Sequence, residues 1–200
     1  MSKPESTPER RHAALLETEL RNFTRLSEVL PPAKVLELAN DFFSLAAMTV
    51  AGNRGKVLSV QNDMLLSAFA TGDRKDYCAN ALKAAQDIQR EFGPMADEWK
   101  TSFGLPAAVS SALHVGEAVF GMAGPIAHQQ FAVFGDVVSI ADRLVHRARN
   151  GEIVLSLDFM NGLGPAAESL GAEEMPPIEL PRRPPIVFYG LLRETRLDFT

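Results

Sequence analysis

The chain has 200 residues, of which 46% are hydrophobic, and its formal net charge is -5. This length and hydrophobic content fit one domain with a substantial core. The acidic balance argues against binding of nucleic acid, since a duplex binder needs a basic face for the phosphates. The single cysteine, Cys78, lies at an apolar position of a helical pattern, which predicts a reduced thiol and a cytoplasmic protein. No apolar run approaches the ~18 residues of a spanning helix, so no membrane segment is predicted in this chain.

The first predicted element follows a polar leader. Residues 1–11 are rich in proline, serine and charge, and they are predicted to be disordered. Residues 13–30 support two interpretations. High helix propensity predicts a helix, whereas the alternation of Leu16, Thr18 and Leu20 with charged residues predicts a strand. The residues alone leave both open.

Helices and hairpins alternate in the middle of the chain. Apolar residues at helical spacing predict helices over 31–52 and 73–93. Two short apolar runs between them predict a hairpin with a polar tip at residues 61–63. Residues 107–124 are predicted to form a second hairpin that turns at residues 116–117.

The last third begins with a strand that leads into a helix. Over 131–149 an aromatic and β-branched run crosses a Gly-Asp turn into a helical period, with Asp136 as the predicted N-cap. A strand at 151–156, a short helix or turn, and a proline-rich loop before a final strand at 186–192 follow. Because hairpins recur among alternating strands and helices, we expect an α+β fold with helices packed on an antiparallel-rich sheet.

Four segments, "NFTRLSE", "HVGEAVFGMAG", "FGDVVSIADRL" and "GEIVLS", occur in this order on elements of matching predicted type. They resemble the GFTxLSE, HxGEVVxGxxG, IGDxVNxAARL and GEIxxS segments of the class III adenylate and guanylate cyclase catalytic domain, and the likeness runs from about residue 14 to 193. The resemblance implies the ferredoxin-like-derived fold of that family, with a strand at the ambiguous first element. It places one cyclase homology domain at residues 12–195, with the proline-rich loop and final strand at 176–193 and a tail at 196–200.

Family members convert ATP or GTP to a cyclic nucleotide and pyrophosphate through attack of the ribose 3′-hydroxyl on the α-phosphate. Two aspartates hold two divalent metal ions, Mg²⁺ or Mn²⁺. The matching positions here are Glu19 and Asp63. Glutamate keeps the charge, but its extra methylene moves the carboxylate, and a misplacement of about 1 Å costs roughly 10²-fold in a positioned reaction. The resemblance therefore implies a weakened metal site.

The substrate-reading positions depart further from the family. Ser59 stands where adenylate cyclases carry a lysine, and Ala132 stands at the partner position, so neither the adenine-reading nor the guanine-reading set is present. Ser139 replaces the asparagine that orients the ribose. Arg143 matches the arginine that stabilises charge on the transferred phosphate. Loss of one preorganised donor typically costs about 3 to 4 kcal/mol, so these departures predict low or absent turnover.

Three hypotheses for the function follow, and they leave open whether the chain is an enzyme. One is a working cyclase, which the resemblance alone supports and which would form a cyclic nucleotide as a metal-dependent homodimer. Because of the departures at Ser59, Ala132 and Ser139, we favour a cyclase homology domain of cyclic-nucleotide signalling with low or no activity. The alternative is a pseudo-cyclase that acts as a dimerising or nucleotide-sensing regulatory module. A third is an enzyme that binds a triphosphate through Glu19 and Asp63 but has a different base pocket.

The resemblance also implies partners. In relatives the metal ligands and the transition-state groups come from opposite subunits, so a homodimer is expected, with a regulatory protein or a better-equipped cyclase as other partners. Apolar side chains are expected at the subunit interface: Val119, Phe120, Met122 and Phe134.

Overall fold

The structure is a computed structural model that describes residues 7–192. In chain order its elements are β1 (Glu9–Arg21), α1 (Phe23–Val29), α2 (Pro32–Gly52), β2 (Lys56–Gln61), β3 (Met64–Phe69), α3 (Arg74–Phe103), β4 (Ala108–Ala123), the 3₁₀ turn η1 (Ile126–His128), β5 (Gln130–Phe134), α4 (Asp136–Val145), β6 (Glu152–Ser156), α5 (Leu157–Leu163), the 3₁₀ turn η2 (Gly164–Leu170), β7 (Glu173–Leu180) and β8 (Arg183–Leu192).

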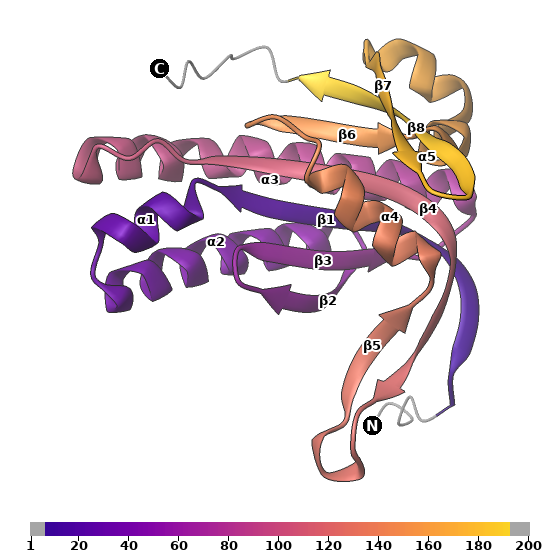
Figure 1. The fold of residues 1–200 in the computed structure, drawn as a ribbon, viewed down its shortest axis with the longest axis horizontal. Coiled ribbons are helices and arrows are strands. Elements are labelled where there is room, and N and C mark those ends of the chain that lie inside the picture. The colour runs from indigo at the N-terminus through magenta and orange to yellow at the C-terminus, as the bar shows by residue number, and fades with distance from the viewer. Residues whose placement is uncertain (1–6, 193–200) are drawn as a thin grey trace.

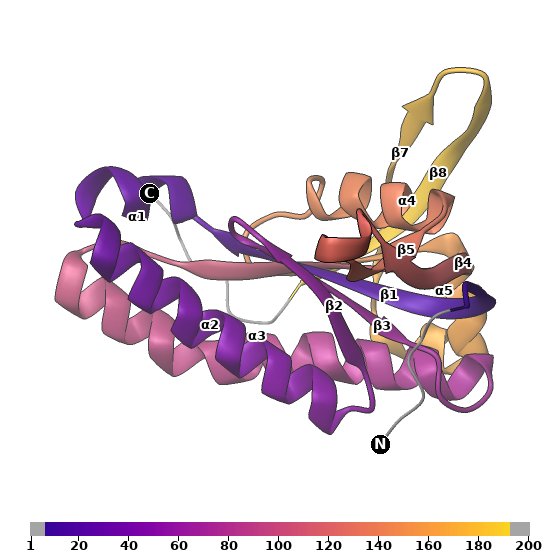
Figure 2. The same ribbon diagram turned by 90° about the horizontal axis from the view of Figure 1, so that it is seen from below.

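These strands form one mixed sheet in the order β2-β3-β1-β4-β6-β8-β7, and β5 pairs with the far end of β4 (Figure 1). Among the described residues only the pairing of β4 with β6 is parallel. Helices α2 and α3 cover one face of the sheet, and α4 lies on the other (Figure 2). The expected α+β fold with an antiparallel-rich sheet is confirmed.

The ambiguous N-terminal stretch contains both predicted elements. β1 runs to Arg21, and α1 follows after Asn22, whose φ of 67° turns the chain. β1 begins at Glu9, so part of the stretch predicted to be a disordered leader belongs to the sheet. Residues 1–6 and the predicted tail at 196–200 lie outside the described residues.

Side chains of β1 alternate between the two faces of the sheet, as the period of a strand requires. Leu16 and Leu20 pack in the main core with α2 and α3, while Ala13 and Leu15 pack against α4 on the opposite face. Glu17 follows Ala13 and Leu15 on the same face of the strand. It therefore points to the side of the sheet that α4 partly covers.

α2 begins at Pro32, one residue after the predicted start, and ends at the predicted Gly52. By length and mean hydropathy it qualifies as a membrane span, contrary to the expectation that no stretch of the chain would. Its Leu38, Phe42 and Ala46 are buried in the core that α2 shares with α3 and the sheet. The apolar face thus serves the interior of this domain.

α3 continues ten residues beyond the predicted end at Gly93, through Pro94 to Phe103. Phe92 and Trp99 are both buried, and their ring centroids lie 5.4 Å apart in an edge-to-face contact. The two rings lie on either side of Pro94 in the sequence, and their contact favours continuation of the helix past the hydrogen bond that the proline removes.

The hairpin predicted at residues 107–124 is wrong. β4 is a single strand that pairs with β1 without a break at Gly116 and Glu117. Gly116 instead allows close approach of α4, since a Cβ added there would lie 3.3 Å from Val137. The glycine marks a helix contact and not a turn.

The proline-rich segment is also not a loop. β7 and β8 form a hairpin, and the register of their pairing shifts between Met175 and Ile178. The two prolines between these residues are exposed at the edge of the sheet. An edge strand tolerates proline there because no neighbouring strand requires its missing N–H.

β5 and the end of β4 form an arm that extends away from the rest of the sheet (Figure 1). Val119, Met122 and Phe134 are exposed on this arm, as expected of interface residues. Phe120 is not available for such an interface. It is buried within its own chain, under the Arg11 guanidinium.

Candidate functional site

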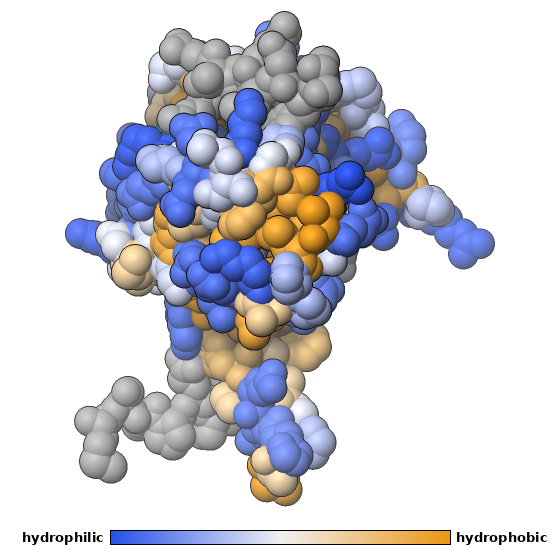
Figure 3. All heavy atoms as spheres, turned by 90° about the vertical axis from the view of Figure 1, so that its left-hand side faces the viewer, coloured by the Kyte–Doolittle hydropathy of each residue, from blue (hydrophilic) through white to orange (hydrophobic). Residues whose placement is uncertain are grey.

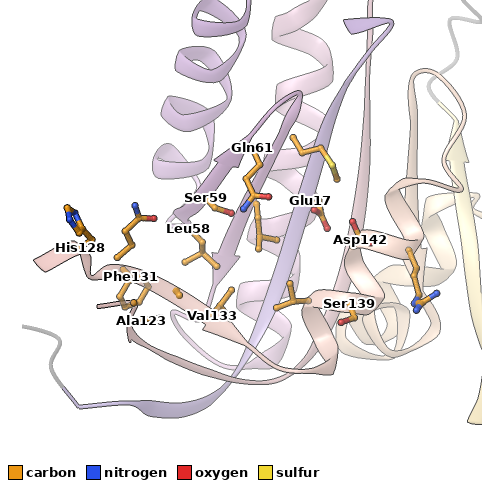
Figure 4. Close-up of a pocket in the computed structure, with 17 residues that line it drawn as sticks. Glu17, Leu58, Ser59, Gln61, Ala123, His128, Phe131, Val133, Ser139 and Asp142 are labelled. Atoms are coloured by element: carbon orange, nitrogen blue, oxygen red, sulfur yellow. The ribbon is translucent and has the colours of Figure 1, made fainter. Parts of the chain in front are cut away.

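A cavity of about 740 Å³ opens between the β2–β3 hairpin, β5 and α4 (Figure 4). Four of the six predicted site residues line it: Ser59, Ala132, Ser139 and Arg143. They come from three elements that are separate in the sequence. Leu58, Phe131 and Val133 add apolar wall, so the cavity combines an apolar lining with a few polar groups, as small-molecule sites do.

Ser59 owes its position to an irregularity in β2. The pairing of β2 with β3 shifts register between Val57 and Ser59, after which Ser59 lies opposite Leu66. Such a bulge bends the strand and changes the direction of the side chains that follow. Ser59 and Leu66 consequently line the same cavity.

α4 presents Ser139 and Arg143 one turn apart, and both side chains line the cavity. The buried Val137 and Ala141 hold the opposite side of the helix against the sheet. Among residues 7–192 no hydrogen bond or ion pair engages the Arg143 guanidinium. Its charge is therefore free to act on an anionic ligand.

Asp136 is not the N-cap that the sequence predicts. Gly135 occupies that position with a φ of 148°, and Asp136 is the first residue of α4. Its carboxylate accepts two hydrogen bonds from Arg183, one of them at 2.7 Å, and these hold the pKa of Asp136 below its ordinary value. The pair ties the start of α4 to β8.

The two predicted metal ligands lie at the edge of this arrangement, and neither lines the cavity. Glu19 Oε1 accepts a hydrogen bond of 2.9 Å from Arg21, whose guanidinium also donates to the carbonyls of Val145 and Ala148 at 2.7 Å. Burial raises the pKa of Glu19, the Arg21 charge counteracts this, and the Asp63 charge adds to it. Asp63 lies at the tip of the β2–β3 hairpin, as predicted.

Glu17 is a site residue that the sequence interpretation missed. It lines the cavity and points toward Asp142 of α4 (Figure 4), yet it is only 7% exposed. Its Oε2 has no hydrogen-bond partner among the described residues. Burial and then the Asp142 charge raise its pKa to about 7. The available signal was its spacing, two residues before Glu19 on the same strand face.

The carboxylates fit a divalent cation that brings other ligands with it. Within residues 7–192 no three His, Cys, Asp or Glu side chains are grouped to hold a metal ion by themselves. Buried oxygens of both Glu17 and Glu19 nevertheless lack hydrogen-bond partners. Mg²⁺ is commonly bound through one or two carboxylates together with water and phosphate oxygens, and this donor set suits that mode.

Comparison with known families supports the sequence resemblance. The family model of the adenylate and guanylate cyclase catalytic domain matches residues 7–191. Adenylate cyclase 1 of Rhizobium meliloti is 27% identical over 146 residues, which is 68% of this chain and 20% of that protein. An uncharacterized protein of Mycobacterium tuberculosis is 28% identical over 149 residues, 74% of this chain and 25% of its own length. The chain thus spans a quarter or less of these relatives.

Solved structures share the fold. The adenylyl cyclase CyaB from P. aeruginosa superposes with a TM-score of 0.86 at 17% identity, over 95% of this chain and 98% of that one. The guanylyl cyclase Cya2 gives 0.80 at 22% identity, over 94% and 96%. A dimeric guanylyl cyclase domain of a fusion protein from Blastocladiella emersonii gives 0.76 at 16%, over 94% and 98%.

Proposed function

The chain belongs to the adenylate and guanylate cyclase catalytic domain family, and from that premise we propose that it binds a nucleoside triphosphate in the cavity and converts it slowly to a cyclic nucleotide and pyrophosphate. The observation that carries this proposal is the convergence of Ser59, Ala132, Ser139 and Arg143 on one cavity. The family resemblance predicted that these four positions line one site, although they are far apart in the sequence.

Arg143 has the main catalytic role in this proposal. Its unpaired guanidinium lines the cavity, where it can donate to the oxygens of the phosphate that is transferred. A donor aimed at developing charge in a partly dry site is worth about 3 to 4 kcal/mol. Ser139, one turn earlier, reaches less far than an asparagine would, so we expect slow turnover.

The purine is proposed to lie near Ser59 and Ala132. Neither side chain carries a charge that would select adenine or guanine. Leu58, Phe131 and Val133 offer apolar contact to either ring system. We therefore expect weak discrimination between ATP and GTP.

A divalent cation, Mg²⁺ or Mn²⁺, would offset negative charge on the attacking and leaving oxygens when it is bound. Glu19 and Asp63 occupy the family positions for its ligands. The Arg21 ion pair already neutralises part of the charge of Glu19, which is consistent with a weakened site.

Two further parts of the proposal concern assembly and location. The exposed Val119, Met122 and Phe134 of the β4–β5 arm favour a homodimer. Cys78 is buried and unpaired, and burial raises its pKa to about 12, which suits a reduced thiol in the cytosol.

A pseudo-cyclase that regulates a partner protein is the second candidate. An apolar hollow between α1, α2 and the tip of β2 favours it, with Leu36 and Val60 strongly exposed. Figure 3 shows apolar side chains gathered on this side of the molecule, above the projecting arm. Such a surface fits a partner as well as it fits a second subunit.

A cyclase assay with Mn²⁺ and either ATP or GTP tests the first candidate. We expect product from the wild-type protein and a loss of about 10²-fold or more in Arg143→Ala. Arg147→Ala is the matched control, because Arg147 is exposed just beyond α4 and does not line the cavity. Product no greater than that of Arg143→Ala would reject the enzyme. Thermal stabilisation by the Mn²⁺ triphosphate without product would then support the pseudo-cyclase.

A further inference from the structure

The carboxyl group of Glu17 is buried, and it forms no ion pair or hydrogen bond with the side chains of residues 7–192. The residue is 7% exposed, its Oε2 lacks a hydrogen-bond partner among the described residues, and its side chain enters the cavity from β1 (Figure 4). Burial of an unpaired carboxylate is costly, and natural structures normally compensate it by a cation or by hydrogen bonds. A compensating group is therefore expected in the cavity itself.

Asp142 increases the local negative charge. It lies on α4, lines the same cavity, and acts on Glu17 more strongly than any other charge. Asp142 lies between Ser139 and Arg143 in the sequence of α4, and its carboxylate faces Glu17 (Figure 4). Two carboxylates from β1 and α4 thus meet at one wall of the cavity.

The neighbouring cationic groups are already engaged. Arg21 pairs with Glu19 and with backbone carbonyls. His146 Nδ1 lies 2.6 Å from the carbonyl oxygen of Asp142 and 3.8 Å from its Oδ1, and the side chain is more than half exposed. Neither group forms a hydrogen bond or ion pair with Glu17 among the described residues, although a charge on His146 lowers the pKa of Glu17 and partly offsets the effect of Asp142. The negative charge of the Glu17 and Asp142 carboxylates at this wall of the cavity therefore has no ion-pair partner among the described residues.

We propose that Glu17 and Asp142 bind a divalent cation at the wall of the cavity, where phosphate oxygens of the triphosphate and water complete its coordination. This rests on the proposed function only for the phosphate ligands, because the two carboxylates come from the protein alone. Paired carboxylate oxygens with few other protein ligands are typical of Mg²⁺ and Mn²⁺. The pair differs from Glu19 and Asp63, and it places the cation on the α4 side, in the same cavity as Arg143.

Mn²⁺ alone tests this site without any nucleotide. The full chain is titrated with Mn²⁺ at pH 8, and binding is followed by loss of the free-ion electron paramagnetic resonance signal. We expect Glu17→Gln and Asp142→Asn each to weaken binding about tenfold or more, because affinity follows the number of charged ligands. Glu152→Gln is the matched control, since Glu152 is a buried glutamate of β6 whose Oε2 already accepts a hydrogen bond from the Arg149 amide.

Glu19→Gln separates the two pairs of candidate ligands. If the proposal is right, it weakens Mn²⁺ binding much less than Glu17→Gln does. Absence of wild-type binding at millimolar Mn²⁺, or binding unchanged in a folded Glu17→Gln protein, would overturn the proposal. Binding through Glu17 without any cyclic product would retain this site and reject the enzyme. If Glu17→Gln forms cyclic nucleotide at the wild-type rate, the enzyme is retained and the cation site at Glu17 and Asp142 is rejected.

Discussion

Replacement of Glu17 by glutamine should stabilise the protein in a way that depends on pH. Burial raises the pKa of this carboxyl from 4.5 to about 7 in the folded chain. A tenfold change in an acid constant corresponds to about 1.4 kcal/mol, so ionisation of Glu17 costs the folded state about 3 kcal/mol. Glutamine has nearly the same shape as the protonated side chain and avoids this cost.

The sign follows from proton linkage. Below about pH 4.5 the group is protonated in both the folded and the unfolded chain, and no penalty arises. As the pH rises toward 7 the unfolded chain ionises first, so the wild type loses stability across this window. We expect Glu17→Gln to exceed the wild type by about 3 kcal/mol in free energy of unfolding at pH 8, and to match it at pH 4.5.

Urea unfolding of both proteins in metal-free buffer at the two pH values measures this difference. The comparison at each pH cancels the contributions of other titrating groups, which both proteins share. Equal stability at pH 8, or a less stable variant there, would refute the argument that Glu17 is a buried and uncompensated charge.

Two other predictions concern the buried titratable groups His114 and Glu19. Burial lowers the pKa of His114 from 6.5 to about 4, so its contribution to stability is complete above pH 6.5 and is lost as the pH falls toward 4. Urea unfolding at pH 7 and pH 4.5 should therefore show a much smaller loss of stability in His114→Gln than in the wild type. Arg21→Ala should lower the free energy of unfolding by about 3 kcal/mol because it leaves the Glu19 carboxylate buried and unpaired. Denaturant unfolding of Arg21→Ala/Glu19→Ala should recover part of that loss, and a double variant as unstable as the sum of the single ones would contradict the pairing.

Regular periodicity predicted the elements well where each element buries one face. The apolar spacing of α2 corresponds directly to the core that it shares with α3, and the alternation along β1, where the residues alone had left a helix open as well, matches the two faces of the strand. Prediction failed where one residue type serves two purposes. Gly116 was interpreted as a turn, but it gives room to Val137 of α4, and the helix predicted to end at Gly93 continues through Pro94 to Phe103.

In the candidate site, too, some residues were predicted from the sequence and others were not. Family motifs indicated Ser59, Ala132, Ser139 and Arg143, and the fold brings these four to one cavity. The metal ligands at Glu19 and Asp63 stay a prediction. Glu17 belongs to no motif that the sequence analysis used, and only its spacing from Glu19 could have marked it as a site residue.

The sequence by itself determined the position and the apolar face of regular elements such as α2 and the first part of α3, because that information repeats every three to four positions along a helix. Tertiary structure alone decided what the charged residues do. Arg21 and Glu17 lie on the same strand, yet one is satisfied by Glu19 and backbone carbonyls while the other faces Asp142. The reason is physical: the free energy of a charge depends on burial and on the charges across from it, and the packing of α4 on the sheet sets both.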